Sequence, residues 1–92
     1  MATVLLPRSL VAMFPGVPRR TEVEGDTVAA VIGALEALWP GMSDRLCEPG
    51  PRIRPFINIF VNGTRADLDD PVPPASVVHV IPAVAGGCDT LR

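Results

Sequence analysis

The stretch Phe56-Ile57-Asn58-Ile59-Phe60-Val61-Asn62-Gly63 decides the fold of this 92-residue chain. Its first six residues are mostly β-branched or aromatic and predict a strand whose side chains alternate between two faces. We expect one face to point into a core, through Ile57, Ile59 and Val61, and the other to hold Phe56, Asn58 and Phe60. The following Asn62-Gly63 tolerates positive φ and predicts a tight turn.

Further strands are expected on both sides of this one. They span residues 3–6, 20–24 and 77–81, with a short return strand within 64–68. The inward-facing residues of the first and last of these strands are Val4, Leu6, Val78 and Val80. Proline and glycine mark residues 10–18, 48–55 and 69–76 as irregular loops. Pro82 is expected to end strand pairing and to release the chain that follows it.

The spacing of apolar residues becomes helical between residues 28 and 39. Steps of three and four place one set of side chains on a common face: Val28, Val31, Ile32, Leu35 and Leu38. Asp26 or Thr27 is placed to cap the helix, and Pro40-Gly41 to end it. Residues 43–46 predict a short capped turn whose Leu46 fills the core.

These elements predict an α+β fold, with a mixed sheet of four to five strands packed on one main helix. One helix covers only one face of such a sheet. The other face keeps Leu5, Phe60, His79 and Ile81, and apolar residues grouped in this way are typical of a surface that binds a partner. The alternative is ordinary scattering of apolar residues over a protein surface.

Composition excludes several classes of function. The net charge is −2 and no basic run occurs, which argues against nucleic-acid binding. No apolar stretch is long enough for a membrane span and no secretory signal is apparent, so we expect a cytoplasmic domain without membrane contact. Two cysteines, Cys47 and Cys88, make no disulfide framework, and the single His79 has no partner at metal-ligand spacing, so no metal site is expected.

All eight basic residues are arginines. Two readings stay open at this point. A chain without lysine cannot acylate its own side-chain amines, which would protect a protein that carries an activated carboxyl group. The same feature also follows from a compositional bias towards Ala, Val, Pro, Gly and Arg.

The stretch Val80-Ile81-Pro82-Ala83-Val84-Ala85-Gly86-Gly87 follows the last predicted strand. Glycine has no Cβ, so Gly86-Gly87 can pass through a narrow channel and allow another backbone to approach closely. A glycine pair behind a slender tail suits a terminus that is inserted into another protein's active site. Here Gly87 is followed by residues 88–92, so its carboxyl group lies in a peptide bond.

The order of these pieces resembles the MoaD/ThiS family of sulfur carriers, which have the ubiquitin-like β-grasp fold. The resemblance rests on Val4-Leu5-Leu6-Pro7, Gly25-Asp26-Thr27-Val28, Asn58-Ile59-Phe60-Val61-Asn62 and residues 81–87. Residues 41–46 and the Ala-Val-Ala-Gly-Gly run are most similar to the CysO branch, which serves a cysteine synthase. The resemblance implies a β-grasp domain over residues 1–82 and a flexible tail over 83–87.

The resemblance also implies a chemistry in which this chain is a carrier and not an enzyme. A ubiquitin-activating-type enzyme uses ATP and Mg²⁺ to adenylate the terminal glycine, and a sulfur donor converts the adenylate to a thiocarboxylate. A synthase then takes the sulfur into cysteine or another metabolite. Gly87 would carry the sulfur, Gly86 would give the tail its reach, and the partner-binding residues would be Leu5, Phe60, His79, Ile81 and Val84. The chain would hold no cofactor of its own.

Residues 88–92 depart from the pattern of most such carriers, which end at the second glycine. We therefore expect proteolysis between Gly87 and Cys88, by a zinc metalloprotease of the JAMM type. Two other functions stay open at this point. The chain could be a ubiquitin-like modifier conjugated through Gly87, or a binding module that has kept the fold without the chemistry.

Overall fold

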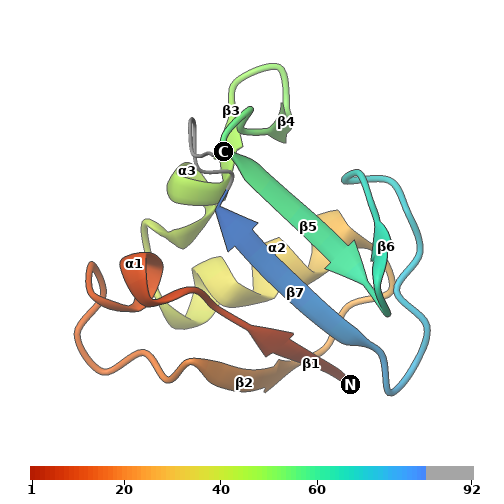
Figure 1. The fold of residues 1–92 in the computed structure, drawn as a ribbon, viewed down its shortest axis with the longest axis horizontal. Helices are drawn as coiled ribbons and strands as arrows, with labels where there is room; N and C mark the ends of the chain where they lie inside the picture. The colour runs from red at the N-terminus through yellow and green to blue at the C-terminus, as the bar shows by residue number, and fades with distance from the viewer. Residues whose placement is uncertain (83–92) are drawn as a thin grey trace, which may run out of the picture.

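The computed structural model describes residues 1–82 of the chain, shown in Figure 1. The predictions for Val84, Gly86, Gly87 and Cys88 therefore lie outside the described residues. The elements, in chain order, are β1 (Ala2–Leu5), α1 (Arg8–Val11), β2 (Arg20–Val23), α2 (Val28–Leu38), α3 (Met42–Leu46), β3 (Cys47–Glu48), β4 (Arg52–Ile53), β5 (Ile57–Val61), β6 (Thr64–Arg65) and β7 (Val77–Pro82).

The main sheet has five strands in the order β2-β1-β7-β5-β6. Its central pair, β1 and β7, is parallel, and every other neighbouring pair is antiparallel. Helix α2 crosses one face of this sheet, so the fold has two layers (Figure 1). The predicted α+β class, with a mixed sheet on one main helix, is confirmed.

The core lies between α2 and the sheet. Alternate residues of β1 and β7 are buried, as the period of a strand requires, and so is one face of α2. Within these elements Val4, Val28, Val31, Leu35 and Val78 are almost fully buried, and so is Ile59 of β5. Leu46 of α3 is also fully buried, which confirms its predicted place in the core.

The start of α2 is fixed by Thr27. Its hydroxyl accepts a hydrogen bond from the backbone N–H of Ala30 at 3.1 Å, so Thr27 and not Asp26 is the side-chain cap. Such a cap contributes about 1 kcal/mol. The prediction was wrong at the other end of the helix, where Leu38 is 55% exposed. Leu38 is the last residue of α2, and its side chain lies at the margin of the buried face.

The turn after β5 confirms the Asn62-Gly63 prediction, with φ of 51° and 86°. The Asn62 side chain also joins this turn to the start of β7. Its Oδ1 accepts a hydrogen bond from the N–H of Val77 at 2.9 Å, and its Nδ2 donates to Oγ of Ser76 at 3.2 Å. Asn62 thereby fixes where β7 begins beside β5.

Helix α3 takes its cap from a distant residue and not from within the predicted turn. The Glu36 carboxylate of α2 accepts hydrogen bonds from the N–H of Gly41 at 2.9 Å and of Ser43 at 2.9 Å. These bonds hold the pKa of Glu36 below its ordinary value. Gly41 itself has φ of 99°, a conformation that favours glycine.

Two short elements replace predicted loops. Residues 48–55 include part of a hairpin in which Cys47 pairs with Ile53 and Glu48 with Arg52. Helix α1 is a single turn after Pro7, at the start of the predicted loop 10–18, where Leu10 and Val17 are buried. Both elements are too short to show a hydrophobic period.

All five strands of the main sheet have bounds that differ from the prediction, and β2 ends one residue early at Val23. Strand β1 begins and ends one residue earlier, β5 begins at Ile57, and β6 ends at Arg65. Strand β7 continues through Pro82, which pairs with Ile57, so Pro82 does not end the pairing. Hydrogen-bonded and non-hydrogen-bonded pairs alternate along an antiparallel ladder. The N–H of Asn62 donates to the Val77 carbonyl at 2.9 Å, so the pair of Ile57 and Pro82, five positions further along, is of the non-hydrogen-bonded kind. Pro82 therefore needs no N–H donor towards β5.

Candidate docking face

The face of the sheet that α2 leaves uncovered is called the outer face here. Its residues are Thr3 and Leu5 of β1, Arg20 and Glu22 of β2, Asn58 and Phe60 of β5, Arg65 of β6, and Val77, His79 and Ile81 of β7. Side chains alternate along a strand, and directly paired residues of neighbouring strands share a face. The outer face therefore follows from the register together with the buried set.

One row of the outer face crosses all five strands. The register pairs Arg20 with Leu5, Leu5 with His79, His79 with Phe60, and Phe60 with Arg65. Leu5 and Phe60 are half-buried, whereas His79 and both arginines are exposed. The middle of the row is therefore an accessible group of two apolar side chains and an imidazole.

Ile81 extends this group towards the C-terminal end of β7. It is 43% exposed and pairs with Asn58 on β5, two residues along from the pair of Phe60 with His79. The expectation that Phe60 and Ile81 lie on neighbouring strands is confirmed. Leu5, Phe60, His79 and Ile81 thus lie together on one accessible face, and Val84 lies outside the described residues.

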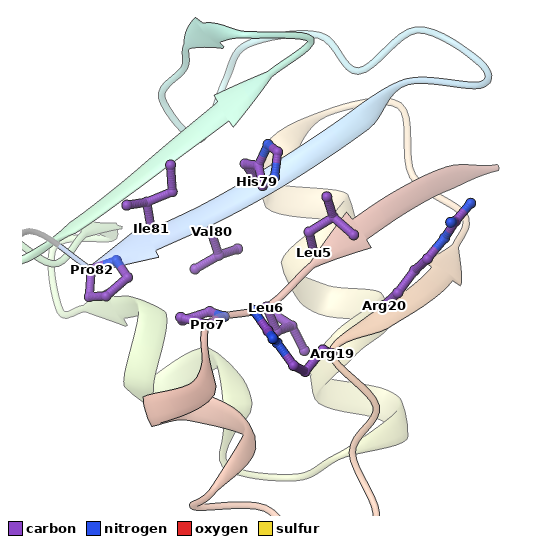
Figure 2. Close-up of a pocket in the computed structure, with 9 residues that line it drawn as sticks. All are labelled: Leu5, Leu6, Pro7, Arg19, Arg20, His79, Val80, Ile81 and Pro82. Carbon is purple, nitrogen blue, oxygen red and sulfur yellow. The ribbon is translucent and has the colours of Figure 1, made fainter.

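A groove of about 460 Å³ lies beside this group, between the ends of β1 and β7. Figure 2 shows Leu5, His79 and Ile81 pointing to one side of the sheet while Leu6 and Val80 point to the other. The groove ends at Pro82, the last described residue, and its other lining residues are Pro7, Arg19 and Arg20. It therefore leads to the point from which the chain continues towards Gly87.

Sequence reasoning missed the arginines that border this face. Arg20 was placed on a strand, but only the pairing of β1 with β2 puts its side chain beside Leu5. Arg65 likewise gains its place from its pair with Phe60. The alternation within each predicted strand was a usable signal for the face, whereas the register across strands was not readable from one sequence.

The remaining groups of residues 1–82 that could carry chemistry are a thiol and possible metal ligands. Cys47 is partly buried, and desolvation raises the pKa of its thiol, with a smaller opposing effect from Arg54. No three His, Cys, Asp or Glu side chains among the described residues are grouped to hold a metal ion. Within the same range, no helix is long and apolar enough to cross a membrane.

A mixed five-stranded sheet with a parallel central pair, folded over one helix and leaving an apolar outer face, defines a ubiquitin-like β-grasp protein. Sequence comparison narrows this class. The sequence model of the ThiS family matches residues 12–87, and the chain belongs to that family.

Similar proteins are known from bacteria and archaea. The chain is 34% identical over 91 residues to the sulfur carrier protein CysO of Mycobacterium tuberculosis, covering 92% of this chain and 97% of the relative. A chain of the crystal structure of the Amycolatopsis orientalis BexX/CysO complex superimposes with a TM-score of 0.85 at 30% identity, covering 95% of this chain and all of that one. SAMP1 of Haloferax volcanii superimposes with a TM-score of 0.73 at 26% identity, covering 94% and 98%.

Proposed function

We propose that this protein is a sulfur carrier whose Gly87, once its carboxyl group is free, is adenylated and converted to a thiocarboxylate. The observation that carries the proposal is the joint presence of a ThiS-family β-grasp domain, an apolar outer face and the glycine pair that follows β7. Its relatives include a protein named as a sulfur carrier over almost the same length. Catalysis belongs to the partners, which act with it in the cytoplasm.

The chemistry proceeds in two steps, a substitution at phosphorus followed by an acyl substitution. The Gly87 carboxylate attacks the α-phosphorus of ATP on a ubiquitin-activating-type enzyme, with Mg²⁺, and releases pyrophosphate. Hydrosulfide then attacks the acyl carbon, AMP leaves, and a thiocarboxylate remains on Gly87. A carboxylate is a poor acyl electrophile and AMP a good leaving group, so activation must precede sulfur transfer.

The domain serves to position this terminus. The five residues after Pro82 span at most about 17 Å, so Gly87 can react no farther than that from the end of β7. A partner must therefore bind close to that end. The outer face and its groove lie there, and Leu5, Phe60, His79 and Ile81 are the contacts we propose for the adenylating enzyme and for the sulfur-accepting synthase, with Val84 contributing from the tail. The acceptor is an activated precursor of cysteine or of another sulfur-containing metabolite.

Gly87 cannot be adenylated while it is bonded to Cys88. We therefore propose that a JAMM-type metalloprotease hydrolyses the Gly87–Cys88 bond and so produces the active carrier. Intact-mass measurement of the protein purified from its native cells tests this step. The expected species ends at Gly87, and a population that consists only of the uncleaved chain would contradict it.

The carrier activity is tested on a chain truncated after Gly87. It is incubated with the adenylating enzyme of its own organism, ATP, Mg²⁺ and sulfide, and weighed intact. We expect a gain equal to the mass difference between sulfur and oxygen, and no gain in the uncleaved chain. An unchanged mass while the enzyme adenylates another carrier would refute the proposal.

The role of the outer face is tested with a matched pair of variants. Ile81→Ala removes an aliphatic side chain that is 43% exposed on the outer face, and Leu38→Ala removes one that is 55% exposed on α2, in the other layer. Both should fold. We expect Ile81→Ala to raise the KM for the carrier several-fold and Leu38→Ala to leave it within error. Equal effects would remove the outer face from the proposal.

A second candidate function is conjugation to other proteins. It is favoured by one observation, the 36% identity over 69 residues to small archaeal modifier protein 3 of Haloferax volcanii, covering 66% of this chain and 70% of that one. A modifier would form adducts with lysine side chains that survive reduction and denaturation. Immunoblots of native cells distinguish this outcome from a thiocarboxylate, which leaves the protein at its own mass.

A further inference from the structure

The row of paired residues across the outer face has an arginine at each end. Arg20 lies on the edge strand β2 and Arg65 on the opposite edge strand β6, with Leu5, His79 and Phe60 between them. Neighbouring strands are about 4.8 Å apart, so four spacings place the two backbone positions roughly 19 Å from each other. The apolar group is therefore bordered by a cation on each side.

Neither arginine forms an ion pair within the described part of the chain. The one ion pair in residues 1–82 joins Arg52 to Glu48 at 2.6 Å, and both Arg20 and Arg65 are exposed. Glu22 is the single carboxylate on the outer face, and it lies in the adjacent row, opposite Thr3. The two guanidinium groups are thus available to an external carboxylate.

The whole chain, in contrast, has a net charge of −2. Five of the ten acidic residues belong to the two loops that meet at the start of α2, namely Glu24, Asp26, Asp67, Asp69 and Asp70. Hydrogen bonds from Val28 N–H to the Asp70 carbonyl at 3.1 Å and from Val72 N–H to the Asp26 carbonyl at 2.9 Å join these loops. Negative charge is favourable there, because the N-terminus of a helix carries a partial positive charge. With two arginines against one glutamate, the outer face is more positive than the protein as a whole.

We propose that the outer face binds a partner surface whose apolar centre is flanked by two carboxylates, one opposite Arg20 and one opposite Arg65. The inference rests on the proposed function, in which the first such partner is the adenylating enzyme. Arginine suits this role because its planar guanidinium binds a carboxylate through two parallel hydrogen bonds. Charges at the border of an interface chiefly set the rate of association and its dependence on salt, while the apolar centre holds the complex together.

The test compares two double variants of the truncated chain, using the adenylating enzyme of its own organism as the probe. R20E/R65E reverses the two bordering charges, and R8E/R45E makes the same change in net charge on the exposed Arg8 and Arg45, outside the outer face. At low salt, about 20 mM, we expect R20E/R65E to lower kcat/KM for adenylation about tenfold or more, through KM, and R8E/R45E less than about twofold. At about 0.5 M salt the gap should narrow to less than about threefold, because salt screens exposed charges.

Each outcome decides the inference. Equal losses in the two variants, or a loss from R20E/R65E that salt does not reduce, would overturn it while leaving the carrier function intact. A truncated parent chain that is never adenylated would overturn the proposed function and this inference with it. If R20E/R65E does not fold, R20Q/R65Q carries the test, with a smaller fall in kcat/KM in the same direction and with the same salt dependence.

Discussion

Gly25 lies between β2 and α2 at a point where the structure leaves no room for a side chain. An ideal Cβ at this position would lie 2.7 Å from the backbone nitrogen of Val31, 2.9 Å from Cγ2 of Val31 and 3.0 Å from the carbonyl carbon of Ala30. Two of these three atoms belong to the backbone of α2. The helix itself, and not a flexible side chain, must move to admit the methyl group of alanine.

That movement disturbs the first turn of α2. The N–H of Val31 donates to the Thr27 carbonyl at 3.0 Å, and the N–H of Ala30 donates to the Thr27 hydroxyl at 3.1 Å. Extra volume at a closely packed site typically costs about 1–3 kcal/mol. We expect Gly25→Ala to lower the free energy of unfolding by an amount in that range. For a domain of this size each 1 kcal/mol corresponds to about 4–8 °C in Tm.

Gly33 provides a matched control, because the same substitution there should act in the opposite direction. It lies inside α2, is exposed, and its ideal Cβ meets no described atom within 4 Å. Alanine in a helix interior is more favourable than glycine by about 0.5–1 kcal/mol. Urea unfolding of both variants, followed by circular dichroism, measures the difference. A Gly25→Ala protein as stable as the parent, or a Gly33→Ala protein less stable than the parent, would refute the packing argument.

Two further predictions follow from the pKa shifts. The lowered pKa of Glu36 means that its bonds to Gly41 and Ser43 stabilise the fold fully above the ordinary pKa of 4.5 and are lost as the pH falls through the lower folded value. Glu36→Gln should therefore have a lower free energy of unfolding than the parent at pH 7, and this difference should shrink in acid unfolding titrations below pH 4.5. A difference that does not change with pH would contradict this. Burial raises the pKa of Cys47, so we expect its thiol to be alkylated slowly in the folded chain truncated after Gly87. The alkylation rate should reach half its maximum at a higher pH in the folded chain than in the same chain unfolded in guanidinium. Equal midpoints would contradict burial as the cause.

Much of the fold could be predicted where a pattern repeats over several residues. The alternation in β5 and β7 and the helical period of α2 each extend over at least five residues, and the structure confirms all three elements. The short hairpin of β3 and β4 was not predictable, since each strand has only two residues and is extended only because it pairs with the other. The cap of α3 was missed for a related reason, because Glu36 reaches it from another helix.

The docking face was predicted in its apolar part only. Inward and outward positions follow from alternation, so Leu5, Phe60, His79 and Ile81 could be assigned to one side of the sheet. The row that runs from Arg20 to Arg65 depends on the relative shift of four strand pairs, which a single sequence does not fix. The charges that border the face were therefore found in the structure alone.

The place of β7 in the sheet has a mechanical consequence. The strand that leads to the C-terminal segment is not at an edge but in the middle, held along one side by β1 and along the other by β5. A pulling force on the segment beyond Pro82 acts on the hydrogen bonds to both neighbouring strands at once. The strand therefore cannot be separated from the sheet one hydrogen bond at a time. Another protein can thus pull the terminus into a tight site, and let it go again, without unravelling the domain that delivers it.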